Sequence, residues 1–160
     1  MDNKTDILFT RIDDRFLHGQ VGIAWNQQIK ASTFLAANDD LAVDIVQQRI
    51  MNSSTPAGTT FICLSILDAA KALIHEKFHR VFLLVGSAED VVRLMKQGVV
   101  FNKINVGNLQ NRDGCIRVTG SVYVNNNDRN AFKTIRDSGV KIEIQRVPTS
   151  PIEDSTHLFK

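Results

Sequence analysis

Short apolar runs alternate with segments of helical periodicity along the whole sequence. Val21, Trp25 and Ile29 recur every four residues, which places them on one face of a helix. The run 81–85 is apolar throughout, which is typical of a strand covered on both faces. The pattern predicts strands over 7–12, 33–37, 60–64, 81–85 and 103–106, within 118–124 and over 141–147, and helices over 20–30, 41–52, 68–75, from a capping box at 87–90 to Gly98, and over 127–138.

Repeated strand–helix–strand units favour an α/β fold with an open, mostly parallel sheet of about seven strands and helices on both faces. The 160 residues contain no linker or low-complexity segment, so we expect a single domain over 1–160. The helix over 41–52 is expected to bury Ile45, Val46 and Ile50. Right-handed crossovers place the strand-to-helix loops at one sheet edge, where function gathers. Those loops are 13–19, 38–40, 65–67, 86–88 and 107–114.

Composition narrows the functional classes further. Hydrophobic residues make up 43% and charged residues 22%, as in ordinary globular domains, and the net charge of +2 indicates neither a nucleic-acid nor an anionic-membrane partner. No signal peptide and no apolar run of membrane-spanning length are visible. Cys63 and Cys115 have no metal-ligand spacing and are interpreted as reduced thiols. The sequence therefore predicts a cytoplasmic domain.

The densest polar chemistry follows the first strand, in the segment RIDDRFLHGQ at 11–20. It connects a strand to a helix, where unpaired backbone N–H groups and the helix dipole favour an anion. His18 stands at this point, beside Gly19, which leaves room for close backbone approach. A neutral imidazole here can accept a phosphoryl group while Arg15 and loop amides hold the oxygens. The alternative is an incidental histidine in a solvated, charged turn.

Two acidic residues belong to the same segment. Asp13 or Asp14 is expected to orient the imidazole or Arg15 rather than to act as a base, because a neutral imidazole needs no deprotonation at the attacking nitrogen. Arg11 is the alternative to Arg15 as the phosphoryl clamp.

Further phosphate-binding candidates come from the same loop and from other loops at this edge. Gly107 follows a strand and could bring amides close to a phosphate, although a plain tight turn explains it equally well. Ser87 also fits a helix cap. The complete set of phosphate-binding candidates is Gly19, Gln20, Ser65, Ser87 and Gly107.

Several other sites are disfavoured by their motifs. The sequence HEKFH at 75–79 matches the zinc-peptidase pattern, but a strand follows at once, so the two histidines are not expected one turn apart on a continuous helix. We therefore expect no metal site. A receiver domain would need an Asp ending the third strand and a Lys ending the fifth, and neither is present. Dinucleotide and P-loop fingerprints and the G-x-S-x-G elbow are also missing.

Segment 11–21, RIDDRFLHGQV, resembles the active-site segment of the IIB components of the mannose/fructose/sorbose family of the bacterial phosphotransferase system (PTS). The similarity extends to INVGN at 104–108, SVYV at 121–124 and GVKIEIQRVP at 139–148, at matching spacing across the chain. The sequence departs from the family mainly at 108–114.

This resemblance implies a protein-phosphohistidine–sugar phosphotransferase. A phosphorylated IIA protein or domain would donate to Nδ1 of His18, and membrane IIC and IID subunits would present the sugar, with no cofactor at this step. The implied sugars are mannose, N-acetylgalactosamine, sorbose or fructose, and the implied location is the inner face of the membrane. A small-molecule α/β enzyme and a pure interaction module are the two alternatives from other classes.

Overall fold

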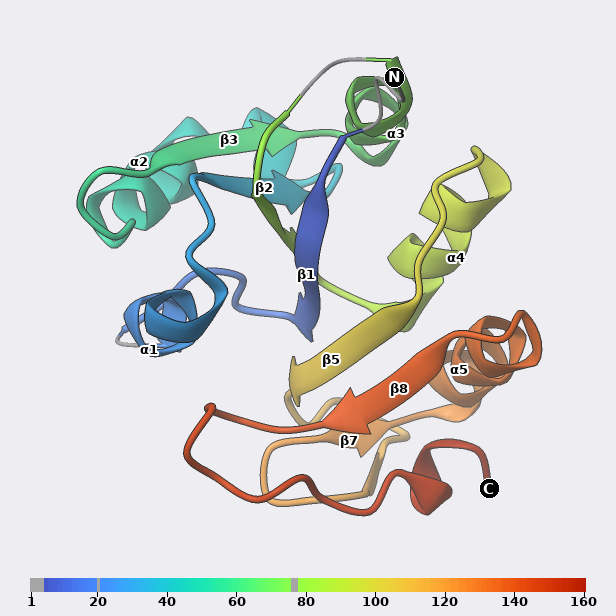
Figure 1. Cartoon of the computed structure of the whole chain (residues 1–160). Helices are drawn as coiled ribbons and strands as arrows, with labels where there is room; N and C mark the ends of the chain where they lie inside the picture. The colour runs from blue at the N-terminus through green and yellow to red at the C-terminus, as the bar shows by residue number, and fades with distance from the viewer. Residues whose placement is uncertain (1–4, 20, 76–77) are drawn as a thin grey trace.

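The computed structural model describes residues 5–19, 21–75 and 78–160. Its centre is a sheet in the order β3-β2-β4-β1-β5-β8, in which every neighbouring pair is parallel. The sheet fans out between the helices in Figure 1. Its strands are β1 (Ile7–Asp13), β2 (Thr33–Ala37), β3 (Thr60–Leu64), β4 (Val81–Val85), β5 (Lys103–Asn108) and β8 (Lys141–Ile144). The helices are α1 (Val21–Ile29), α2 (Ile45–Ser53), α3 (Ile66–His75), α4 (Ala88–Lys96) and α5 (Asn126–Asp137), with 3₁₀ turns η1 (Leu41–Val43) and η2 (Thr156–Leu158).

The prediction of an α/β fold around a parallel sheet is confirmed, but the expected number of strands is wrong. The main sheet has six strands, and the segment 118–124 contributes instead to a small antiparallel pair, β6 (Ile116–Arg117) with β7 (Tyr123–Val124). An isolated bridge joins Val122 of this segment to Leu109, the residue that follows β5. Val122 is fully buried, so the apolar residues of this segment reflect burial rather than pairing within the main sheet.

Successive side chains of β2 and β4 belong to two different hydrophobic clusters. Leu35 and Leu83 pack with buried residues of α3, α4 and α5, whereas Phe34 and Phe82 pack with buried residues of α1 and α2. The rings of Phe34 and Phe82 stack with centroids 4.8 Å apart. This division follows from the strand geometry, because neighbouring side chains point to opposite faces.

The helix expected over 41–52 is divided, and its apolar side chains are not buried. Asp44 separates η1 from α2 and caps α2 by accepting a hydrogen bond from the N–H of Gln47 at 3.0 Å. Ile45, Val46 and Ile50 are 62%, 67% and 53% exposed, so the prediction that they are core residues is wrong. The face of α2 that packs against the protein is set by tertiary contacts rather than by the spacing of apolar residues. The buried residue of α2 is Met51.

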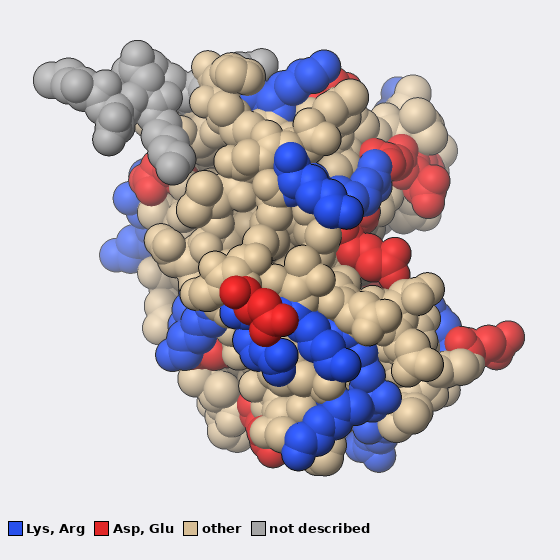
Figure 2. All heavy atoms as spheres, turned by 90° about the vertical axis from the view of Figure 1, so that its right-hand side faces the viewer, with Lys and Arg blue, Asp and Glu red and all other residues tan. Residues whose placement is uncertain are grey.

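Charged side chains are unevenly spread over the side of the molecule that carries α4 and α5. Figure 2 shows Lys and Arg side chains gathered over the lower part of this face. No helix within the described ranges 5–19, 21–75 and 78–160 is both long and apolar enough to cross a membrane.

Candidate functional site

The loop between β1 and α1 starts at the carboxyl end of a central strand, flanked by β4 and β5. It turns sharply after Asp13, whose carbonyl accepts the N–H of Phe16 at 2.9 Å. Phe16 has a φ of 58°, a left-handed conformation that costs a side-chain-bearing residue about 1–2 kcal/mol. Burial of its ring offsets this cost, and a Cβ on Gly86 would lie only 2.9 Å from that ring. Phe16 therefore anchors the turn and fixes the residues on either side.

His18 and Asp13 form the central contact of the loop. The Nε2 of His18 lies 2.9 Å from the Oδ2 of Asp13, and the carboxylate is completely buried while the imidazole is 23% exposed. The other carboxylate oxygen accepts the backbone N–H of Arg15 at 2.9 Å. A carboxylate can only accept, so a neutral imidazole in this contact carries its proton on Nε2. Its Nδ1 then has a free lone pair, and no described residue forms a hydrogen bond with that nitrogen.

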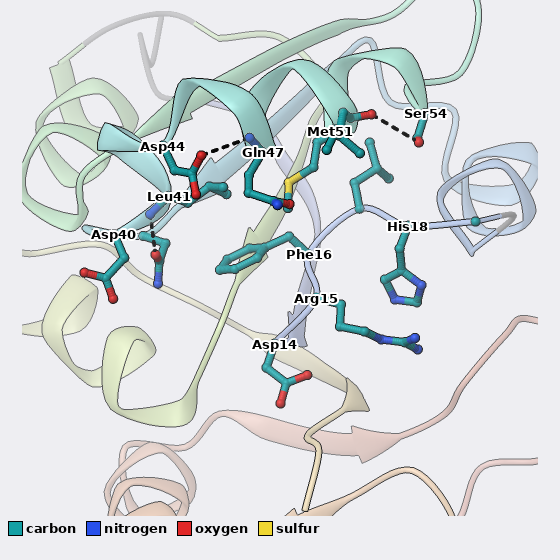
Figure 3. Close-up of a pocket in the computed structure, with 14 residues that line it drawn as sticks. Asp14, Arg15, Phe16, His18, Asp40, Leu41, Asp44, Gln47, Met51 and Ser54 are labelled. Atoms are coloured by element: carbon teal, nitrogen blue, oxygen red, sulfur yellow. Dashed lines mark hydrogen bonds between the residues drawn. The ribbon is translucent and has the colours of Figure 1, made fainter. Parts of the chain in front are cut away.

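The backbone N–H of Arg15 is hydrogen-bonded to Asp13, while its side chain extends into solvent. Its side chain is exposed, and within the described part of the chain its guanidinium makes neither a hydrogen bond nor an ion pair. Arg15 and His18 line the same pocket, and both side chains extend from the outer side of the loop in Figure 3. An unpaired guanidinium beside a free ring nitrogen can hold anionic oxygens through parallel hydrogen bonds.

Asp14, next to Asp13 in sequence, has a different set of partners. Its Oδ1 accepts the side-chain amide of Asn108 at 2.7 Å, and its Oδ2 accepts the backbone N–H of Gln110 at 2.7 Å. The structure thus brings Asp13 to the imidazole, whereas Asp14 ties the start of the 108–114 loop to the β1–α1 loop.

Arg11 lies behind the site and does not reach the pocket. Its side chain is 2% exposed, and it donates to Asp13 at 3.3 Å and to the side chain of Asn105 at 2.7 Å. Its guanidinium is therefore occupied by buried acceptors rather than free for an incoming phosphoryl group.

The other predicted phosphate ligands that the structure describes lie at the same edge of the sheet but differ in what their atoms do. The hydroxyls of Ser65 and Ser87 accept the N–H of Asp68 and of Asp90, each at 3.1 Å, and so cap α3 and α4. Gly107 packs against the guanidinium of Arg11. The Gly19 backbone has a φ of 52° and lines the pocket with His18. Gln20 lies outside the described residues.

The pocket beside His18 has a volume of about 570 Å³. The β1–α1 loop forms one wall, and η1 and α2 form another, as Figure 3 shows. Its lining combines the apolar side chains of Phe16, Leu41 and Met51 with the carboxylates of Asp40 and Asp44. The described residues hold no group of three His, Cys, Asp or Glu side chains arranged for a metal ion.

Sequence reasoning missed two parts of this site. It did not assign any role to Phe16, although an aromatic residue inside so charged a segment was a signal for an anchor. It also missed Asn105, whose carboxamide accepts from Arg11 and donates to the carbonyl of Gln145 at 3.1 Å. No local pattern reveals that contact, because it joins strands far apart in the sequence.

Comparison with known proteins identifies the family. The family model described as PTS system sorbose subfamily IIB component matches residues 7–160. An N-acetylgalactosamine-specific phosphotransferase enzyme IIB component 2 from Escherichia coli is 36% identical, covering 97% of this chain and 98% of its own. A PTS system fructose-specific EIIB component from Bacillus subtilis is 31% identical, covering 97% and 96% respectively. The crystal structure of the IIBSor domain of the Klebsiella pneumoniae sorbose permease superposes with a TM-score of 0.89 at 28% identity, covering 96% of each chain.

The fold and the histidine loop thus define a IIB-type phosphotransferase domain. The chain belongs to the sorbose subfamily of PTS IIB components, which confirms the family indicated by segment 11–21. Phosphotransfer in sugar uptake is the activity of this family. A mannose-specific EIIAB component from Escherichia coli matches at 32% identity, and there the matched region is 44% of the longer protein.

Proposed function

We propose that His18 accepts a phosphoryl group from a phosphorylated IIA protein or domain and passes it to a sugar entering through membrane IIC and IID subunits. The observation that carries this proposal is the 2.9 Å contact between His18 Nε2 and Asp13 Oδ2. It keeps the ring proton on Nε2 and leaves Nδ1 as the nucleophile.

The phosphoryl transfer needs no base at the attacking nitrogen, because Nδ1 carries no proton. The lone pair of Nδ1 forms a bond to phosphorus as the bond between phosphorus and the donor histidine breaks, and the ring proton stays on Nε2, where it is hydrogen-bonded to Asp13. In the second step a sugar hydroxyl oxygen bonds to phosphorus, the Nδ1–phosphorus bond breaks with its electron pair returning to Nδ1, and the hydroxyl proton is released to water. Arg15 would neutralise the charge on the transferred oxygens, because phosphoryl transfer depends mainly on positioning and electrostatic stabilisation. In this proposal Gly19 and Gln20 bind phosphoryl oxygens, whereas Ser65 and Ser87 act as helix caps and Gly107 makes room for Arg11 rather than binding phosphate.

The family membership supports the wider setting. In this proposal the segment 1–160 acts as one IIB unit at the cytoplasmic face of the membrane, without a cofactor or a nucleic-acid partner. Its sugar belongs to the class named for its relatives, which include fructose-, mannose-, sorbose- and N-acetylgalactosamine-specific components.

Labelling from a radioactive, phosphorylated IIA donor tests the proposal. We expect one acid-labile phosphoryl group, mapped by peptide analysis to His18, and a His18→Ala variant that folds but accepts none. His157→Ala is the matched control, because His157 lies in η2, distant in sequence from the loop, and should label fully. Label on another histidine in His18→Ala, or an unlabelled parent protein, would reject the assignment.

A further inference from the structure

Arg11 is a buried cation in the middle of the sheet, directly behind Asp13. It is among the largest fully buried side chains of the described protein. Burial lowers the pKa of the Arg11 guanidinium, and the Asp13 carboxylate opposes that change. Arginine nevertheless stays charged in proteins, so a full positive charge lies within the sheet.

This guanidinium is fixed from several sides. One terminal nitrogen donates to the side chain of Asn105 at 2.7 Å and to the carbonyl of Gln145 at 3.1 Å, while the other donates to Asp13 Oδ2 at 3.3 Å. Its central carbon lies 5.9 Å from the centre of the Trp25 ring. Strands β1 and β5, the end of β8 and helix α1 therefore all hold the group in one place.

Space for the guanidinium depends on Gly107. A Cβ at this position would lie 1.9 Å from the central guanidinium carbon and about as close to both terminal nitrogens. The backbone of Gly107 is not among those with positive φ, so its conformation does not demand glycine. The absence of a side chain at 107 is required by the close approach of Arg11.

Stability alone does not account for this arrangement. The Nε of Arg11 is buried without a hydrogen-bond partner among the described residues. Buried ion pairs are often no more stabilising than apolar residues of similar volume, because desolvation offsets the attraction. We therefore look for a role of the buried guanidinium in the histidine site, through its contact with Asp13.

We propose that Arg11, seated against Gly107, is a positioning residue that acts through Asp13 on His18. Arg11 and His18 contact the same oxygen, Asp13 Oδ2, at 3.3 and 2.9 Å. The fixed guanidinium holds the carboxylate oxygen aimed at the Nε2 proton. The imidazole is then held with Nδ1 outward before a donor arrives. This inference rests on the proposed role of His18.

Single-turnover transfer from phosphorylated IIA, measured in a double-mutant cycle, tests the coupling. Arg11→Met removes the positive charge, and Asp13→Asn replaces the buried carboxylate with a neutral amide. We expect Arg11→Met to slow transfer by roughly tenfold to a hundredfold, the range found when outer partners of metal-bound histidines are removed. In the Asp13→Asn background the same change should cost less than about threefold, since the interaction through which it acts is already lost.

Gly107→Ala tests the same idea while retaining the arginine, because the new methyl group would displace the guanidinium. It should slow transfer in the same way, and Arg11→Lys should recover part of the rate lost in Arg11→Met. Val106→Ala is the matched control. It removes apolar volume from the neighbouring buried position of β5, and Val106 packs in the cluster that contains buried residues of α3, α4 and α5. This control should lower stability without a comparable loss of rate.

Nuclear magnetic resonance of the unphosphorylated protein separates this inference from the proposed function, because it needs no donor. We expect an observable His18 Nε2 proton in the parent and in Val106→Ala, and its loss through solvent exchange in folded Arg11→Met and Gly107→Ala. Unchanged proton signals and transfer rates in these two variants, or additive losses in the cycle, would overturn the role of Arg11. A parent that never accepts phosphate on His18 would instead reject the proposed function.

Discussion

The loops that follow β1 and β4 leave neighbouring strands at the same edge of the sheet, yet they use their polar side chains differently. After β4, the Ser87 hydroxyl accepts the N–H of Asp90 and completes the N-terminal turn of α4. After β1, Asp13 and Asp14 bind atoms outside their own helix, and the His18 and Arg15 side chains retain groups that no described residue binds.

This difference shows that position at a strand end is only part of what makes a site. Both loops lie where open α/β sheets place function. In the β4–α4 loop, local capping satisfies the serine hydroxyl. In the β1–α1 loop, the buried Asp13 carboxylate positions the imidazole and leaves one ring nitrogen with its lone pair. Reactivity follows from which atoms remain available after folding.

The largest effect that should sharpen this contrast comes from Arg15. Its exposed guanidinium, which no described residue binds, is expected to hold phosphoryl oxygens in the transition state, so Arg15→Ala should lose on the order of 10²–10³ in rate. Arg15→Lys should lose less, because it keeps the charge but not the paired hydrogen bonds. Single-turnover transfer from phosphorylated IIA at saturating protein measures both.

Arg49→Ala is the matched control for Arg15, because Arg49 is an exposed arginine of α2 that does not line the pocket. It should transfer at the parent rate. A rate for Arg15→Ala within roughly threefold of the parent would fall well short of the loss of a transition-state donor. The phosphoryl clamp would then belong to the loop amides near Gly19 rather than to Arg15.

Predictions from the sequence succeeded where a local pattern determines the structure and failed where contacts between residues far apart in the sequence determine it. The strands at 33–37, 60–64 and 81–85 have the predicted bounds, because uninterrupted apolar runs mark strands within a parallel sheet. The prediction for α2 failed in two ways: Asp44 divides the segment and caps a helix that begins at Ile45, and α2 buries Met51 rather than Ile45, Val46 and Ile50. All three apolar residues lie in the helix, so their exposure reflects which face packs against the protein, and spacing within the helix does not determine that.

The candidate site shows the same division. The charged segment around His18 is visible in the sequence, and the family comparison supports its importance. The sequence left open which acid faces the imidazole. That choice depends on contacts from Arg11 to Asn105 and from Asp14 to Asn108, each spanning 94 positions. Pairings of this range are set by the order of the strands rather than by local pattern.

A smaller effect is expected from the β4–α4 loop. Ser87→Ala removes the hydroxyl that caps α4 and should lower the free energy of unfolding by about 1 kcal/mol. Urea denaturation measures this change, and Ser87→Thr should recover most of it because threonine also caps helices. Phosphoryl transfer by Ser87→Ala should stay within roughly twofold of the parent, since surface changes away from a site usually act within ±0.5 kcal/mol. A tenfold loss of rate with normal folding would show that Ser87 contacts the phosphoryl group and that the two loops are alike.

The smallest effect is expected at the opposite edge of the sheet, where His75 and His79 resemble a zinc-peptidase motif. Such a motif needs both imidazoles one turn apart on a continuous helix, with a further ligand. Here α3 is described as far as His75, residues 76 and 77 lie outside the described residues, and His79 is an exposed, non-helical residue whose carbonyl accepts the hydroxyl of Ser32 at 2.8 Å near the start of β4. His75→Ala combined with His79→Ala should therefore transfer within roughly twofold of the parent, as surface substitutions usually act within ±0.5 kcal/mol. A chelator should leave the parent rate unchanged in the same assay. Zinc retained at one equivalent through dialysis, with transfer lost when it is removed, would contradict this expectation and would place chemistry at both edges of the sheet.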